Sequence, residues 1–160
     1  MADFASAFAA LIGNEGGYSN DPKDPGGETM WGVTARVARA HGYTGAMRDM
    51  PIETARGIAR AEYWDPYRCD ELPEAIGFQV LDAAYNGGYP VKWLQLAVGE
   101  KPDGKIGSAT IAAANAADVY RTCMRFLALR LAYLTSLKGW AHDGKGWAAR
   151  IARNLMKGAV

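Results

Sequence analysis

FASAFAALIGNEGGYSNDPKDPGGETMWGVT, residues 4–34, joins an apolar helical pattern to a segment rich in turn formers and carboxylates. Apolar side chains recur at intervals of three and four residues, which lie on one face of a helix, at Phe4, Phe8, Leu11 and Ile12. Glu15 continues this face, and the two glycines after it predict the end of the helix. We therefore expect the carboxyl group of Glu15 in the last helical turn, at the inner edge of the core.

This position predicts an unusual acidity for Glu15. Partial burial and the negative end of the helix dipole both oppose ionisation of a carboxyl group, so we expect its pKa to be raised. A raised pKa is what a general acid needs to hold its proton near neutral pH. The alternative is a structural glutamate that pairs with a C-terminal arginine or caps a neighbouring helix.

The loop that follows concentrates polar groups around two Asp-Pro steps. Asp21, Asp24 and Glu28 supply carboxylates, and Thr29 supplies a hydroxyl group. An acid at the end of a helix and a second carboxylate on the next loop are the minimal equipment for splitting a glycosidic bond. The first protonates the leaving oxygen, and the second, or a water that it orients, acts on the oxocarbenium-like centre. A calcium loop is the alternative, but the spacing is not that of an EF-hand and prolines interrupt it.

Two aromatic residues, Tyr18 and Trp31, stand beside these carboxylates. Their flat rings offer faces on which sugar rings can lie. We therefore predict that Tyr18 and Trp31 contact the substrate, together with Asp21 and Glu28.

This segment resembles the opening signature of the glycoside hydrolase family 108 N-acetylmuramidases, lysozyme-like proteins found as phage endolysins and as bacterial proteins once labelled secretion activators. The resemblance rests on EGGY at 15–18, NDP at 20–22, DPGGET at 24–29 and GVT at 32–34. The family's second block, often described as a predicted peptidoglycan-binding region, is similar to LDAAYNGG at 81–88, WLQLAVG at 93–99 and PDGKIGSAT at 102–110. The resemblance covers most of the chain and implies a lysozyme-like fold and a glycosidase activity.

The resemblance also implies roles for single residues. The family's catalytic glutamate corresponds to Glu15, in the Glu-Gly-Gly-Tyr motif. The interval from Glu15 to Asp24 matches the spacing in phage-type lysozymes, whereas the interval from Asp24 to Thr29 is one residue shorter. Asp24 and Thr29 are therefore candidate catalytic partners, and Asp21 and Glu28 remain alternatives for the second carboxylate.

The second block adds candidate substrate contacts. Tyr85 and Asn86 would bring a ring and an amide to the cleft, where Asn86 would hold an N-acetyl group or a catalytic water. The alternative is that the following glycines end a helix and Asn86 caps the turn. Gln95 lies one helical turn from Lys92 and is expected to face the same groove, although a solvated helix face explains this pair equally well.

The rest of the chain has helical periodicity almost throughout, which predicts an all-α domain of about seven helices. Beyond the first helix, we expect helices at 33–40, 52–63, 76–85, 91–98, 108–114 and 119–137. Residues 1–160 are expected to form one lysozyme-like domain, in which 1–98 is the catalytic lobe and 99–160 the peptidoglycan-binding part. Cys69 and Cys123 lack metal or redox spacing and are expected to be buried free thiols.

Charge is distributed unevenly. Residues 121–160 hold eight basic residues against Asp143, a net charge of +7, in a chain whose overall charge is +1. This excess favours an anionic partner such as an envelope surface, and the alternative is a solvated helix face. The start of the chain lacks a basic n-region, so we expect no secretory signal. We expect synthesis in a bacterial cytoplasm, followed by action on the cell wall or periplasm after release.

The sequence thus predicts a monomeric muramidase that acts on peptidoglycan glycan strands without a metal or another cofactor and without nucleic acid. It would cleave the β-1,4 bond between N-acetylmuramic acid and N-acetylglucosamine, with Glu15 as general acid. One alternative is a lytic transglycosylase, in which a single glutamate serves as acid and base. The other is a wall-binding or secretion-assisting protein without catalysis.

Overall fold

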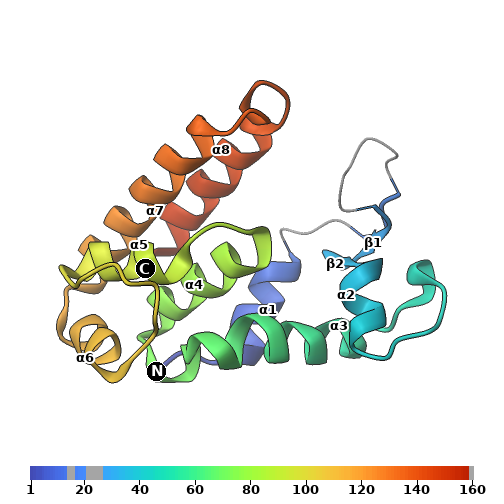
Figure 1. Cartoon of the computed structure of the whole chain (residues 1–160), viewed down its shortest axis with the longest axis horizontal. Helices are drawn as coiled ribbons and strands as arrows, with labels where there is room; N and C mark the ends of the chain where they lie inside the picture. The colour runs from blue at the N-terminus through green and yellow to red at the C-terminus, as the bar shows by residue number, and fades with distance from the viewer. Residues whose placement is uncertain (14–16, 21–26, 159–160) are drawn as a thin grey trace. The chain divides into compact units, whose positions relative to one another are not determined.

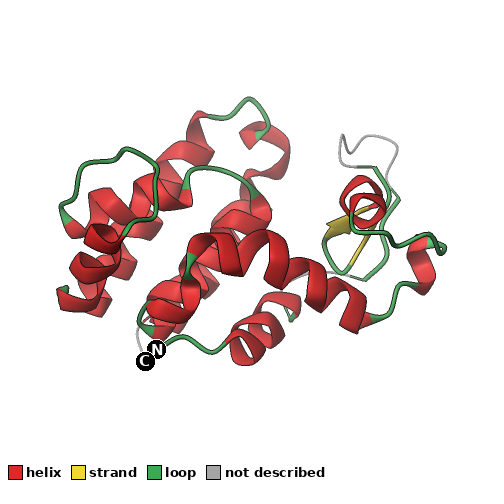
Figure 2. Cartoon of the chain, turned by 60° about the horizontal axis from the view of Figure 1, so that its bottom comes forward, coloured by secondary structure: helices red, strands yellow, loops and turns green. Residues whose placement is uncertain are grey.

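The computed structural model describes residues 1–13, 17–20 and 27–158, and the chain packs as two compact units. The smaller unit is Phe4–Pro66, and the larger unit joins Met1–Asp3 to Tyr67–Val160. Helices dominate both units (Figures 1 and 2), and the described residues form eight α-helices. The expected all-α class is therefore confirmed. The assignment of 1–98 to catalysis and 99–160 to wall binding concerns roles and stays a prediction.

The smaller unit is built on the apolar face of α1, Phe4–Ile12. Phe4, Ala7, Phe8 and Leu11 are buried, close to the stripe that the periodicity predicts. The ring centroid of Phe4 lies 5.2 Å from that of Trp64, which is fully buried. Trp64 ends a π-helical turn that follows α3, Ile52–Ala59, so the helix expected at 52–63 changes its winding at residue 60.

A β-hairpin precedes α2 in this unit. Strands β1, Thr29–Met30, and β2, Val33–Thr34, pair antiparallel, and α2 is the short helix Ala35–Ala40. The prediction of a helix over 33–40 was therefore wrong for its first two residues. The reason is local: the side chain of Thr34 accepts a hydrogen bond from the Val37 amide, so Thr34 caps the helix and does not belong to it.

The larger unit surrounds α4, Glu74–Asn86, whose residues 76–84 are all buried. A helix that is buried on every side must be covered by neighbours, and here α5, α7 and α8 pack on it. The bounds of the remaining helices are Pro90–Val98 for α5, Ser108–Ala116 for α6, Val119–Ser136 for α7 and Trp140–Gly158 for α8. The two longest, α7 and α8, lie side by side (Figure 1).

A proline and a glycine mark the two ends of α5. Pro90 is the first residue of α5, where its missing N–H costs no helical hydrogen bond. Gly99 ends α5 with a φ of 83°, the left-handed conformation typical of glycine C-caps. α6 begins at Ser108, and Gly107 occupies its N-cap position without a side-chain hydrogen bond.

Both cysteines, Cys69 and Cys123, are buried free thiols, as predicted. Burial raises the pKa of Cys123 to about 11, which keeps this thiol protonated and unreactive at neutral pH. In the part of the chain that the structure describes, every helix is too short or too polar to cross a lipid bilayer.

Candidate active site

A hydroxyl–carboxylate pair marks the expected site in the smaller unit. The Tyr18 hydroxyl donates a hydrogen bond to Glu28 Oε1 at 2.8 Å. The guanidinium of Arg48 lies 5.3 Å from the centre of the Tyr18 ring, a cation–π arrangement that fixes the ring. Tyr18 remains 38% exposed, so the pair is open to a ligand. Two residues selected separately from the sequence are thus brought together.

Backbone pairing positions this pair. The Ser19 amide donates to the Thr29 carbonyl at 3.0 Å, and the Thr29 amide donates to the Ser19 carbonyl at 2.8 Å. Because side chains alternate across an extended chain, Tyr18 and Glu28 lie on one face of this ladder, and Thr29 lies on the other. Glu28 and Thr29 therefore present their side chains to opposite sides of the same segment.

Trp31 forms the tip of the hairpin with Gly32. Their φ angles are 54° and 79°, and positive φ at both central residues is the hallmark of a two-residue type I′ turn. Positive φ costs a bulky residue about 1–3 kcal/mol, so other contacts must hold Trp31 there. One is the hydrogen bond from its indole Nε1 to the Met50 carbonyl at 3.0 Å. The ring of Trp31 is half-buried and held in a defined orientation.

Three of the carboxylates selected from the sequence, Glu15, Asp21 and Asp24, lie outside the described residues. The described helix α1 ends at Ile12. The roles of these three groups therefore stay predictions.

In the larger unit, Tyr85 and Asn86 form the end of α4. The side-chain amide of Asn86 donates to the Asp82 carbonyl at 2.8 Å, and Asn86 is exposed while Tyr85 is half-buried. Gly87 and Gly88 follow with φ angles of 85° and 121°. Asn86 thus closes the last turn of the helix.

Gln95, expected in the substrate groove, is only 2% exposed. Its amide nitrogen donates to the Asp103 carboxylate at 2.7 Å and to the Lys105 carbonyl at 3.1 Å, and its amide oxygen accepts from the Gly104 amide at 2.9 Å. Gln95 therefore holds the loop of the PDGKIGSAT motif in shape. A sugar would reach its amide only by displacing this loop.

Sequence reasoning did not find the buried ionic cluster around Asp82. This carboxylate is fully buried and accepts hydrogen bonds from Arg130 at 2.5 Å, Asn154 at 2.8 Å and Arg150 at 3.0 Å. Burial alone would raise the pKa of Asp82, but the guanidinium groups of Arg130 and Arg150 outweigh it and hold the pKa below its usual value. The signal in the sequence was an aspartate within an otherwise apolar run, VLDAA at 80–84.

Among the described residues, no three histidine, cysteine, aspartate or glutamate side chains gather closely enough to hold a metal ion. The expectation that the protein needs no cofactor stays a prediction.

The chain is similar to a known protein family and to a solved structure. Residues 8–88 match the model of the family described as glycosyl hydrolase 108. Among solved structures, the chain is similar to SagA of Brucella abortus, with 33% sequence identity and a TM-score of 0.87 over 98% of this chain and 93% of that one. This likeness supports the lysozyme-like helical fold expected from the sequence. None of the curated proteins matches the chain.

Proposed function

We propose, from the premise that the chain belongs to the glycosyl hydrolase 108 family, that this protein is a peptidoglycan hydrolase of the muramidase type. Its substrate is the β-1,4 bond between N-acetylmuramic acid and N-acetylglucosamine. The observation that carries the proposal is the match to the family over residues 8–88, which include the complete segment of turn formers and carboxylates.

Glu15 is the proposed general acid. Its proton passes to the glycosidic oxygen as the bond from this oxygen to the sugar's anomeric carbon breaks. A water molecule supplies the hydroxyl group of the new reducing end, and its remaining proton returns to a carboxylate. Support for Glu15 is its place on the apolar stripe of the first helix and the resemblance of its motif to the family signature.

Asp24 is the proposed catalytic partner, with Thr29 as the hydroxyl that orients a water or the substrate. Asp21, Tyr18, Glu28 and Trp31 are proposed substrate contacts. The exposed Tyr18–Glu28 pair supports part of this set, because a hydroxyl and a carboxylate can exchange hydrogen bonds with the hydroxyl groups of a sugar.

Tyr85 and Asn86 are also proposed to contact the glycan, through a ring and an exposed side-chain amide at the end of α4. Gln95 is not assigned a sugar contact, since its amide is engaged by the loop at 103–105.

The proposed setting is an endolysin made in a bacterial cytoplasm that acts on the cell wall after release. We further propose that it works as a monomer, that it does not use nucleic acid as a partner, and that its basic C-terminal part faces an anionic envelope surface. The envelope contact rests on the charge distribution, and the setting rests on the resemblance to the family.

End-group analysis of muropeptides tests the reaction type. Purified sacculi are digested with the protein, and the released fragments are analysed by mass spectrometry. A muramidase leaves reducing N-acetylmuramic acid ends. Anhydro ends would instead indicate a transglycosylase, and a complete lack of release, together with retention of the protein on sacculi, would indicate a binding protein.

A further inference from the structure

We propose that the outer surface of α7, with the adjoining side chains of α5 and α8, binds the surface of an anionic phospholipid bilayer. This surface, here called the α7 face, is defined by apolar and basic side chains. The apolar members are Leu96, Tyr120, Met124, Leu155 and Met156, and the basic members are Arg121, Arg125 and Arg153. The proposal narrows the anionic envelope surface of the proposed function to a phospholipid bilayer, and it is independent of catalysis.

Exposed apolar side chains are concentrated on the α7 face. Nine large apolar side chains are exposed in the described part of the chain, and five of them belong to this face. Met156 is 74% exposed, Met124 57% and Tyr120 50%. Scattered exposed apolar residues are ordinary on protein surfaces, whereas a contiguous group with a polar rim marks a binding surface.

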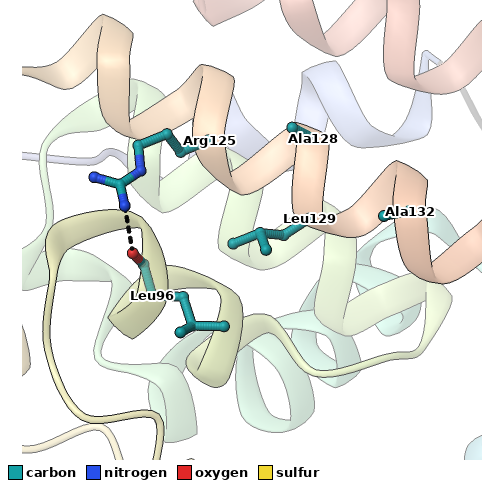
Figure 3. Close-up of a pocket in the computed structure, with 5 residues that line it drawn as sticks. All are labelled: Leu96, Arg125, Ala128, Leu129 and Ala132. Atoms are coloured by element: carbon teal, nitrogen blue, oxygen red, sulfur yellow. Dashed lines mark hydrogen bonds between the residues drawn. The ribbon is translucent and has the colours of Figure 1, made fainter.

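Two apolar hollows flank α7 within this group. One, of about 310 Å³, lies between α7 and α8 and is lined by Tyr120, Met124, Leu127, Leu155 and Met156 with Cys123 and Gly158. The other, of about 410 Å³, lies between α5 and α7, where Leu96 and Leu129 face it with Ala128 and Ala132 (Figure 3). Met124 and Ala128 are one helical turn apart on α7, so the ridge of this helix separates the two hollows.

The charged residues of the α7 face are all cationic. Neither Arg121 nor Arg153 forms an ion pair within the described residues, and Arg125 donates to the Leu96 carbonyl at 3.2 Å. α7 contains no acidic residue. Asp118 caps its N-terminus, and Asp143, the only acid of α8, lies in the first turn, about 20 Å along the helix from Met156.

The combination of exposed apolar side chains and arginines on the α7 face favours a lipid bilayer over a second copy of the chain as its binding partner. A second copy of the chain, docked through the same face, would place the arginines of both copies against each other, and like charges oppose such a contact. An anionic bilayer accepts all of them at once, while the methionine and leucine side chains enter the boundary between headgroups and acyl chains. Arginine stems are long enough to reach phosphates while their carbons stay on apolar surface.

Vesicle sedimentation tests the proposal with the intact protein. We expect it to sediment with vesicles that contain phosphatidylglycerol, to bind vesicles of pure phosphatidylcholine much more weakly, and to be released by salt. Replacing Arg121 and Arg153 by serine should weaken partitioning roughly 25-fold, at about fivefold for each cation. Replacing Met124 and Met156 by serine should weaken it about tenfold or more.

Matched variants away from the α7 face serve as controls. Lys101→Ser with Lys138→Ser removes the same charge, and Ile52→Ser removes an apolar side chain that is 42% exposed on α3; both should bind vesicles like the native protein. Glu15→Gln should bind equally well, which separates this proposal from the catalytic one.

Three outcomes would overturn the proposal. The first is equal binding, or no binding, to anionic and neutral vesicles. The second is an equal loss of binding in the control and α7-face variants. The third is concentration-dependent dimerisation that Met124→Ser with Met156→Ser abolishes, which would assign the α7 face to a second copy.

Discussion

Glu28 and Asp82 are both carboxylates held by hydrogen bonds, yet their surroundings give them opposite properties. Glu28 is half-exposed at the start of a hairpin, and its described hydrogen-bond partner is the hydroxyl of Tyr18. Asp82 is fully buried and is held by Arg130, Arg150 and Asn154. Glu28 can exchange its partner for a ligand, while Asp82 cannot do so without leaving buried charges uncompensated.

Burial and the charge of the hydrogen-bond partner together determine whether a carboxylate can bind a ligand or instead stabilises the fold. A carboxylate in contact with solvent and paired to a neutral group keeps acceptor capacity for substrate hydroxyls. A carboxylate between two guanidinium groups joins α4, α7 and α8, so we assign Asp82 to stability, whereas a functional role for the hairpin is a proposal.

The largest expected effect on stability comes from Asp82→Asn. This change removes the negative charge and leaves the buried Arg130 and the partly buried Arg150 without compensation, which should lower the free energy of unfolding by about 3–5 kcal/mol. Denaturant titration followed by circular dichroism measures the loss. Glu28→Gln is the matched comparison and should change stability by less than about 0.5 kcal/mol; equal losses for both variants would remove the distinction.

At acid pH, the native protein and Asp82→Asn should become closer in their free energy of unfolding. Because the folded-state pKa of Asp82 is depressed, its contribution to stability is complete above the unfolded-state value of about 3.9 and is lost as the pH falls through the folded-state pKa. The gap between the two unfolding free energies should therefore narrow below about pH 4. A gap that stays constant down to strongly acid pH would show that Asp82 acts through packing alone.

Gly32→Ala should have a smaller effect, confined to the hairpin. Gly32 has a φ of 79°, and a residue with a Cβ atom costs about 1–2 kcal/mol in this left-handed region. Thermal unfolding should shift to lower temperature, and the rate of muropeptide release should also fall, because Trp31 and Thr29 lose their support. Unchanged activity despite the lower stability would show that the hairpin has no part in substrate binding or catalysis.

The smallest expected change in stability is that of Tyr18→Phe, within about 0.5 kcal/mol of the native protein, because the lost hydrogen bond is exposed. Activity should nevertheless fall several-fold, since Glu28 loses the group that orients it. Tyr43→Phe is the control, because it removes an exposed hydroxyl that donates to the Ala46 carbonyl in the same unit. If both variants kept full activity, the Tyr18–Glu28 pair would have no part in substrate binding.

Periodicity was sufficient to predict most helices, because their apolar residues are spaced for one buried face. Phe4, Phe8 and Leu11 are buried as the pattern predicts, and Pro90 and Gly99 mark the ends of α5. The two free thiols were predicted because Cys69 and Cys123 lack metal or redox spacing, and the burial of Cys123 also fits its place in an apolar helical run.

Contacts between residues far apart in the chain could not be predicted from the sequence. The partners of Asp82 lie 48 to 72 residues away, and local spacing carries no information about such contacts. The hairpin was missed because its strands have two residues each, too few for an alternating pattern. For Gln95, the helical position was right, but the loop at 103–105 covers its amide.

The central claim is that Glu15 is the general acid of a muramidase, and Glu15→Gln tests it most directly. The rate at which reducing muropeptides are released from purified sacculi should fall by about 100- to 10,000-fold, the usual contribution of a general acid. Glu53→Gln, which removes an exposed carboxylate from α3 in the smaller unit, should retain the native rate. Near-native release by Glu15→Gln, with reducing ends still formed, would contradict the account.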